Sequence, residues 1–170
     1  VELRCPDDDN RPRHICVACG AIHYQNPKMV IGSIPEWENP EGENKILLCR
    51  RAIEPRYGLW PLPAGFLELG ETTAEGAVRE TVEEAGAKIE LGPLFTLLNV
   101  VRVGQVHLFY RATMTSPELD PGSETLEARL FREDEVPWEQ IAFRTVRETL
   151  QLFFADRRRS HFEFHAADIA

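Results

Sequence analysis

The sequence predicts an α/β protein in which a mixed β-sheet packs between helices. Several segments are continuously apolar or alternate between apolar and polar residues, as strands do, whereas two others repeat apolar residues at helical spacing. The chain has 170 residues, enough for one domain with its own hydrophobic core plus a small appendage. We see no internal repeat and no low-complexity segment.

Five segments read as strands. They are Met29–Trp37, Lys45–Ala52, Ile89–Val101, Gln105–Thr115 and Leu126–Arg132. The first two form a hairpin around a polar loop, and the third and fourth are joined by a turn at Val103 and Gly104.

A helix is expected over Phe143–Arg157. Its predicted inner face consists of Val146, Thr149, Leu150, Phe153 and Phe154. Three arginines at 157–159 end this helix; we expect a solvated C-terminus favoured by the helix dipole, with phosphate contact as the alternative.

The other helix carries three carboxylates on one face. Glu80, Glu83 and Glu84 stand at positions i, i+3 and i+4. The opposite face is expected to be the apolar one, with Val78, Thr81, Val82 and Ala85. Like charges within one turn repel unless a cation neutralises them, and Mg²⁺ or Mn²⁺ suits oxygen ligands. A solvated acidic face is the alternative, but it does not explain the glycine-rich loop before the helix.

That loop contains Gly65, where a backbone carbonyl can approach a metal. Thr72 or Thr73 is expected to cap the helix, and Glu71 to form an ion pair with Arg79 that locks the loop onto it.

Gly65, Glu71 and the run Arg79-Glu-Thr-Val-Glu-Glu-Ala-Gly-Ala87 together resemble the Nudix box, the signature of the Nudix hydrolases. Thr81 and Ala87 depart from the pattern, since bulkier aliphatic residues are usual there. The resemblance covers roughly residues 28–152. It implies an α/β/α sandwich and hydrolysis of a nucleoside diphosphate linked to another moiety.

The resemblance also implies roles for individual residues. Glu80, Glu83, Glu84 and the carbonyl of Gly65 would hold one to three divalent ions against a pyrophosphate. Glu83 is the first candidate for the base that accepts a proton from the attacking water. Glu127, on the last expected strand, is the second candidate, and an exposed strand residue is its alternative interpretation.

Further residues are candidates for substrate contact. Arg51 lies on the strand before the box and suits a bidentate phosphate contact, whereas strand alternation turns Arg50 the other way. Trp60, Phe66 and Phe109 could stack on a base or flavin, although core positions are their more common role.

Cys16 and Cys19 form one knuckle of a zinc ribbon, which needs four ligands. Cys5 is a possible third ligand, or a second Cys-x-x-Cys could precede Val1. His14 and His23 are weaker candidates. Cys49, within an apolar run, is expected to be a buried free thiol.

We therefore expect a partial zinc-ribbon segment at residues 1–27 and a Nudix hydrolase domain at residues 28–170. Residues 21–34 resemble Nudix proteins with an N-terminal zinc ribbon, in the NADH, FAD and ADP-ribose pyrophosphatase-like branch. The Ser-Gln-Pro-Trp-Pro-Phe-Pro block usual in the NADH enzymes is missing, which places FAD and ADP-ribose ahead of NADH. The alternatives are a house-cleaning hydrolase of modified nucleoside triphosphates or RNA caps, and a non-catalytic sensor.

The composition of the chain argues against some classes of binding partner. Lys and Arg total 19 against 28 Asp and Glu, a net charge of −9, which argues against general nucleic-acid binding. No run approaches a membrane span and no signal peptide is visible, so we expect a cytoplasmic protein without a membrane partner. Four cysteines fit a reducing compartment. The resemblance implies a homodimer.

Overall fold

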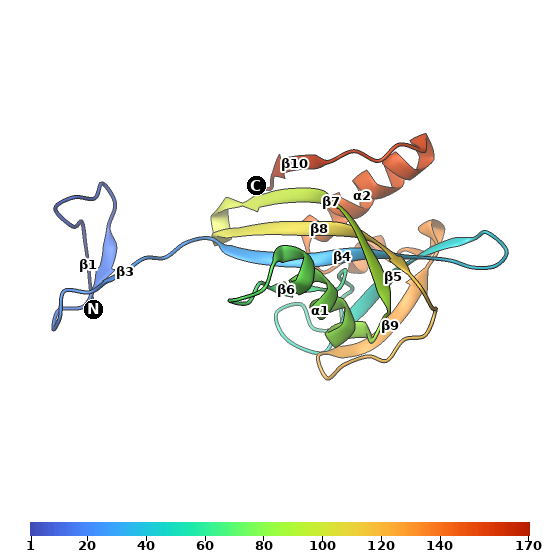
Figure 1. Ribbon diagram of the computed structural model, residues 1–170, viewed down its shortest axis with the longest axis horizontal. Helices are drawn as coiled ribbons and strands as arrows, with labels where there is room; N and C mark the ends of the chain where they lie inside the picture. Colours follow the sequence, from blue (N-terminus) through green and yellow to red (C-terminus); the bar gives the residue numbers. More distant parts are fainter.

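The computed structural model describes residues 1–170 and contains two β-sheets (Figure 1). The small N-terminal sheet consists of β1 (Glu2–Arg4), β2 (Arg13–Ile15) and β3 (Ile22–His23). The main sheet consists of β4 (Lys28–Glu38), β5 (Asn44–Arg51), β6 (Ala64–Phe66), β7 (Ile89–Val100), β8 (Gln105–Met114), β9 (Thr125–Phe131) and β10 (His165–Asp168). The helices are α1 (Thr73–Ala85) and α2 (Arg144–Arg159), with 3-10 turns η1 (Val101–Val103), η2 (Glu133–Glu135) and η3 (Trp138–Gln140).

The main sheet is mixed, as predicted. Its strand order is β10-β7-β8-β4-β5-β9, with β6 paired to β4. The pairs β4–β8 and β10–β7 are parallel, and the other pairs are antiparallel. The five expected strands and the second helix are confirmed with boundaries that differ by at most two residues. The short strands β6 and β10 were not expected, and Gly65 lies in β6 rather than in a loop.

The two faces of the sheet carry two separate cores, one under each helix. On the α2 face, the aromatic cluster includes Phe95, Phe109 and Phe131 from the sheet and Phe153 and Phe154 from the helix. On the α1 face, a smaller cluster contains Leu47, Cys49, Ala85, Ala87 and Met114. Successive residues of β5 point to opposite faces, so one strand serves both cores. The result is the expected α/β/α sandwich.

Helix α1 begins and ends at clear signals. Thr72 and Glu75 form a reciprocal capping box, and Gly86 ends the helix in the left-handed conformation with a φ of 61°. The buried residues are Gly76, Ala77, Thr81 and Ala85. The hydroxyl of Thr81 is paired with that of Ser33 at 2.6 Å, so this departure from the box pattern is accommodated by a hydrogen bond.

The predicted apolar face of α1 is confirmed for Thr81 and Ala85, which are buried, but not for Val82, and the acidic face is not fully solvated. Val82 is 51% exposed, and Glu80 and Glu84 are partly buried beside the small residues of the inner face. Glycine and alanine let α1 approach the sheet closely, and the acidic side chains therefore enter a pocket at its edge rather than solvent.

A buried carboxylate fastens the C-terminal segment to α2. Asp156 is fully buried; it accepts hydrogen bonds from His165 Nε2 at 2.8 Å and the Glu163 amide at 3.1 Å, and also pairs with Arg159. Arg159 bonds both Asp156 and Glu163, so this cluster is neutralised within the protein. Arg157 likewise pairs with Glu36 and Glu133 rather than ending in solvent, which corrects the prediction for this residue. Arg158 and Arg159 are exposed, as expected.

The Asp156 contacts predict a pH-dependent contribution to stability. Burial alone would raise the pKa of Asp156, but its hydrogen bonds to His165, Glu163 and Arg159 lower it to about 2. Because the folded pKa lies below the unfolded one, the stabilisation is present above about pH 4 and is lost as the pH falls toward 2. Asp156→Asn is expected to lower the free energy of unfolding by on the order of 2 kcal/mol at pH 7. Urea unfolding measures the difference, which should shrink below pH 4.

Asp134→Asn is the matched control, since this carboxylate is 74% exposed in a surface ion pair with Arg132. We expect its effect to stay below about 0.5 kcal/mol. Equal effects of the two substitutions would contradict the role given to Asp156.

Candidate active site

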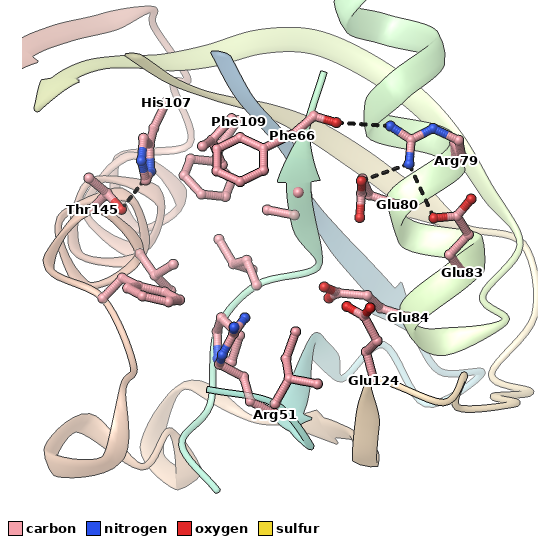
Figure 2. Close-up of a pocket in the computed structure, with 18 of the residues that line it drawn as sticks. Arg51, Phe66, Arg79, Glu80, Glu83, Glu84, His107, Phe109, Glu124 and Thr145 are labelled. Atoms are coloured by element: carbon pink, nitrogen blue, oxygen red, sulfur yellow. Dashed lines mark hydrogen bonds and ion pairs between the residues drawn. The ribbon is translucent and has the colours of Figure 1, made fainter. Parts of the chain in front are cut away.

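A pocket of about 870 Å³ opens at the edge of the main sheet, beside α1. Its walls come from β4, β6, α1, β8, the segment before β9 and the start of α2. Figure 2 shows that the two sides differ in chemistry: Glu80, Glu83, Glu84 and Glu124 gather on one side, and His107 and Thr145 lie across from them. Its size is in the range of sites that hold a nucleotide-sized molecule.

Arg79 organises the acidic side. Its guanidinium donates to both carboxylate oxygens of Glu71, at 2.7 and 2.9 Å. It also donates to Glu80 at 2.7 Å, to Glu83 at 3.1 Å and to the carbonyl of Phe66 at 3.1 Å. The structure thus joins the residues that the sequence placed in the loop and on the helix. A planar donor with five hydrogens suits this task, which a lysine could not perform.

Burial raises the pKa values of two of these carboxylates, Glu80 and Glu84. Burial, reinforced by the charge of Glu80, raises the pKa of Glu84 to about 8. Burial likewise raises the pKa of Glu80, and the hydrogen bond from Arg79 only partly offsets this. Oε2 of Glu84 is buried and has no hydrogen-bond partner. A buried carboxylate oxygen without a partner is costly, and it identifies a place where a cation would lower the free energy.

Gly65 lets β6 pass directly under Glu80. A Cβ atom at this position would lie 2.3 Å from Oε1 of Glu80, which is closer than any real contact. The potential metal ligands gathered here are the carboxylate oxygens of Glu80, Glu83 and Glu84. That donor set and the unpartnered oxygen of Glu84 fit a hard divalent cation such as Mg²⁺ or Mn²⁺.

Glu83 differs from its two neighbours on α1. Its side chain is 58% exposed and its only partner is Arg79. It lies at the rim of the pocket, where water can reach it. A solvent-accessible carboxylate beside the buried pair is placed to accept a proton from water.

The structure does not bring Glu127 into the pocket. Glu127 is exposed on β9, where it pairs with Arg50. A register irregularity between Arg50 and Arg51 leaves Thr125 opposite Arg51, and Glu124, just before β9, lines the pocket instead. Sequence reasoning missed Glu124 because strand alternation alone cannot locate such an irregularity.

Arg51 lines the pocket beneath the carboxylates, as Figure 2 shows. Its Nε donates to the carbonyl of Pro55 at 2.8 Å, and its guanidinium lies 5.2 Å from the ring centre of Phe143. Arg50 instead donates to the carbonyl of Gly58. Arg51 therefore offers further guanidinium hydrogens to the pocket.

The other side of the pocket was not predicted. His107 Nδ1 lies 3.0 Å from the hydroxyl of Thr145, and its Nε2 lies 2.9 Å from Oε1 of Gln105. Burial lowers the pKa of His107 to about 4, so the ring is neutral near pH 7. No motif marks these residues, because β8 and α2 bring them together only in the fold. Of the three candidate aromatics, Trp60 and Phe109 are core residues, whereas Phe66 is 47% exposed at the pocket.

Cys16 and Cys19 lie in a tight turn that follows β2. Cys16 pairs through its backbone with Gly20 and Ala21, and hydrogen bonds from the backbone of Cys19 and Ala18 lower its pKa. Both features suit a metal-binding knuckle. Cys5 is exposed nearby in sequence.

The other candidate zinc ligands are two histidines of the N-terminal sheet and Cys49 of β5. His14 and His23 face each other across β2 and β3. Cys49 is 2% exposed, and burial raises its pKa, as expected for a structural thiol.

Comparison with known proteins identifies the family. Residues 34–153 match the NUDIX domain and residues 1–25 match the Nudix N-terminal family, a zinc ribbon. The chain therefore belongs to the Nudix hydrolase family. The expected resemblance and fold are confirmed.

Three relatives illustrate the match. A NUDIX hydrolase structure from Nitrosomonas europaea is 46% identical with a TM-score of 0.92, covering 99% of this chain and 93% of that one. An ADP-ribose pyrophosphatase from Methanocaldococcus jannaschii is 32% identical over 71% of this chain and 69% of its own length. YjhB from Bacillus subtilis is 35% identical over 56% of this chain, and the match spans 48% of that relative, about half its length. No helix of the chain is long and apolar enough to cross a membrane.

Proposed function

We propose that this chain hydrolyses the pyrophosphate bond of nucleoside diphosphate derivatives of the FAD, ADP-ribose or NADH class, with Mg²⁺ or Mn²⁺, and releases a nucleoside monophosphate. The observation that carries the proposal is the buried, unpartnered oxygen of Glu84 within a cluster of carboxylates at one side of a nucleotide-sized pocket.

Each residue of the acidic side then has a task. Glu80, Glu84 and the carbonyl of Gly65 would hold the divalent cation, which when bound neutralises phosphoryl charge and acidifies water. Arg79 fixes the orientation of Glu80 and Glu83. Glu83 accepts the proton as water attacks phosphorus, and Glu124 is the second candidate for this role in place of Glu127.

Arg51 would contact the phosphate that leaves with the nucleoside. Its Nε is already bonded to Pro55, so the terminal nitrogens are the ones directed to substrate. A guanidinium matches two phosphoryl oxygens at once, which holds the bond in line with the attacking water.

Neither alternative function has comparable support. A non-catalytic sensor would not need Glu80, Glu83 and Glu84, all of which are present. A house-cleaning hydrolase of nucleoside triphosphates or RNA caps would use the same acidic side, so products must separate it from our proposal.

We also propose a homodimer, a cytoplasmic location and a division of the chain into residues 1–27 and 28–170.

A product analysis tests the proposal. The purified chain is incubated with Mg²⁺ or Mn²⁺ and FAD, ADP-ribose, NADH, diadenosine polyphosphates, GDP-sugars or nucleoside triphosphates. We expect AMP with FMN from FAD, or AMP with ribose 5-phosphate from ADP-ribose, and less activity on NADH. Cleavage of triphosphates alone, with release of inorganic pyrophosphate, would replace this proposal by the house-cleaning function.

We further propose that Cys16 and Cys19 hold a structural Zn²⁺. Metal analysis should then find roughly one zinc per chain, and Cys16→Ser should release it while sparing hydrolysis. Cys49→Ser is the control, because this thiol is buried in the smaller core cluster under α1, away from the N-terminal sheet. Zinc retained after Cys16→Ser, or no zinc in the unsubstituted protein, would contradict the assignment.

A further inference from the structure

On the side of the pocket opposite the carboxylates, Gln105, His107 and Thr145 form a chain of hydrogen bonds, called the relay below. The donor and the acceptor of each bond can be assigned. A neutral histidine has one N–H and one acceptor nitrogen, and an amide oxygen only accepts. The contact with Oε1 of Gln105 therefore places the proton on Nε2 of His107, and Nδ1 accepts from the hydroxyl of Thr145. The relay holds the Gln105 amide through its oxygen and leaves the NH₂ group for a ligand of the pocket. The two hydrogens of this group are offered to the pocket that Gln105 lines.

An exposed aromatic ring lies on the same pocket. Phe66 is 47% exposed, and Lys28 Nζ lies 5.1 Å from its ring centre. Figure 2 shows Phe66 between His107 and the carboxylates of α1. Its backbone carbonyl accepts a hydrogen bond from Arg79, which fixes the backbone from which the ring projects. A large apolar ring exposed at a pocket favours a ligand that covers it.

The chemistry of this side selects the ligand group. The relay itself contains no cation, because burial keeps His107 neutral, and Lys28, the cation beside the Phe66 ring, does not line the pocket. This wall is therefore less suited to a phosphate than the Arg51 side is. A sugar would use the Gln105 hydrogens, but its puckered ring covers an aromatic face less completely than a planar heterocycle does. A planar heterocycle with acceptor atoms on its edge uses both, by stacking and by hydrogen bonding.

We propose that Gln105 and Phe66 form the subsite for the heterocyclic base of the substrate, with His107 and Thr145 as positioning residues. The inference rests on the proposed function for the identity of the substrate. It assigns the organic end of that substrate to a wall of the pocket outside the Nudix box, so that the phosphates lie between this wall and the carboxylates.

Binding of products to the purified chain tests the subsite. Titration calorimetry with Mg²⁺ compares the nucleoside 5′-monophosphates of adenine, guanine, cytosine and uracil with ribose 5-phosphate, which lacks a base. We expect at least one nucleotide to bind roughly tenfold more tightly than ribose 5-phosphate. Gln105→Leu and Phe66→Leu should each reduce this ratio by about fivefold or more through weaker nucleotide binding, with ribose 5-phosphate affinity unchanged.

Matched controls separate this role from a structural one. Gln151→Leu makes the same change at an exposed position of α2 outside the pocket. Thr145→Val removes the hydroxyl that anchors His107, whereas Thr149→Val removes a hydroxyl one turn later that bonds Thr96 instead. Gln105→Leu and Thr145→Val should lower the ratio of nucleotide affinity to ribose 5-phosphate affinity. Gln151→Leu and Thr149→Val should leave it unchanged.

Wild-type protein that binds ribose 5-phosphate as tightly as every nucleotide would overturn the subsite, as would an unchanged ratio in both Gln105→Leu and Phe66→Leu. Hydrolysis of a pyrophosphate bond with such an unchanged ratio would overturn the subsite alone. A base preference that depends on Gln105 and Phe66 in a chain that hydrolyses no pyrophosphate would overturn the proposed function and support the subsite.

Discussion

Glu84→Gln is expected to reduce turnover by roughly three orders of magnitude while leaving the fold intact, which corresponds to about 4 kcal/mol in the barrier. Glu84 supplies a buried oxygen with no partner in the protein, and an amide cannot replace a carboxylate as a ligand of a hard cation. Steady-state hydrolysis of ADP-ribose at saturating Mg²⁺ measures the loss. Near-normal turnover in the variant would contradict the assignment of the metal site.

The same substitution should stabilise the metal-free protein. Without a cation, folding must either bury the charge of Glu84 beside Glu80 or protonate it, as its raised pKa shows, and Glu84→Gln removes both costs. A rise in the melting temperature of a few degrees is expected, equivalent to about 1 kcal/mol. Glu83→Gln should reduce turnover without this rise, because Glu83 is exposed and paired with Arg79. Glu127→Gln is the control for activity, and a large loss there would restore Glu127 as a candidate base.

Arg79→Ala is expected to impair both stability and turnover. The guanidinium joins three carboxylates and the Phe66 carbonyl, and the side chains of Glu71 and Glu80 are only 16% and 12% exposed. Its removal leaves those charges without a partner, so we expect a loss of about 2–3 kcal/mol in the free energy of unfolding. Turnover should fall by roughly a hundredfold or more, because Glu80 and Glu83 lose their fixed orientation. Urea unfolding and ADP-ribose hydrolysis measure the two effects.

Arg132→Ala gives the comparison for stability. Arg132 also contacts several carboxylates, but its side chain is 45% exposed. Its removal should cost less than about 1 kcal/mol and leave turnover unchanged. If the two variants were equally stable, the network around Arg79 would be an ordinary surface ion pair.

Local patterns predicted the fold well, because strand alternation and helical spacing reflect which side of each element is buried. The inner face of α2, from Val146 to Phe154, follows directly from that spacing. The orientation of α1 did not follow. Its inner face is made of glycine and small residues, and its partly buried carboxylates carry no signal that separates them from a solvated acidic face.

The candidate site divides in the same way. Residues within the box could be found by their spacing, since one loop and one helix hold them. Glu124 could not, because a register irregularity at Arg50 and Arg51 determines its position. The pairing of His107 with Thr145 joins residues 38 positions apart, and only the packing of α2 on β8 brings them to one pocket.

The central claim is that the carboxylates of α1 hold the divalent cation on which hydrolysis depends. Titration of Mn²⁺ into metal-free protein, followed by electron paramagnetic resonance of the free ion, tests it most directly. We predict that wild-type protein binds Mn²⁺ over the concentration range that restores hydrolysis of ADP-ribose, and that Glu84→Gln loses this binding. Equal Mn²⁺ binding by Glu84→Gln and wild type, or full hydrolysis in the presence of EDTA, would contradict the claim.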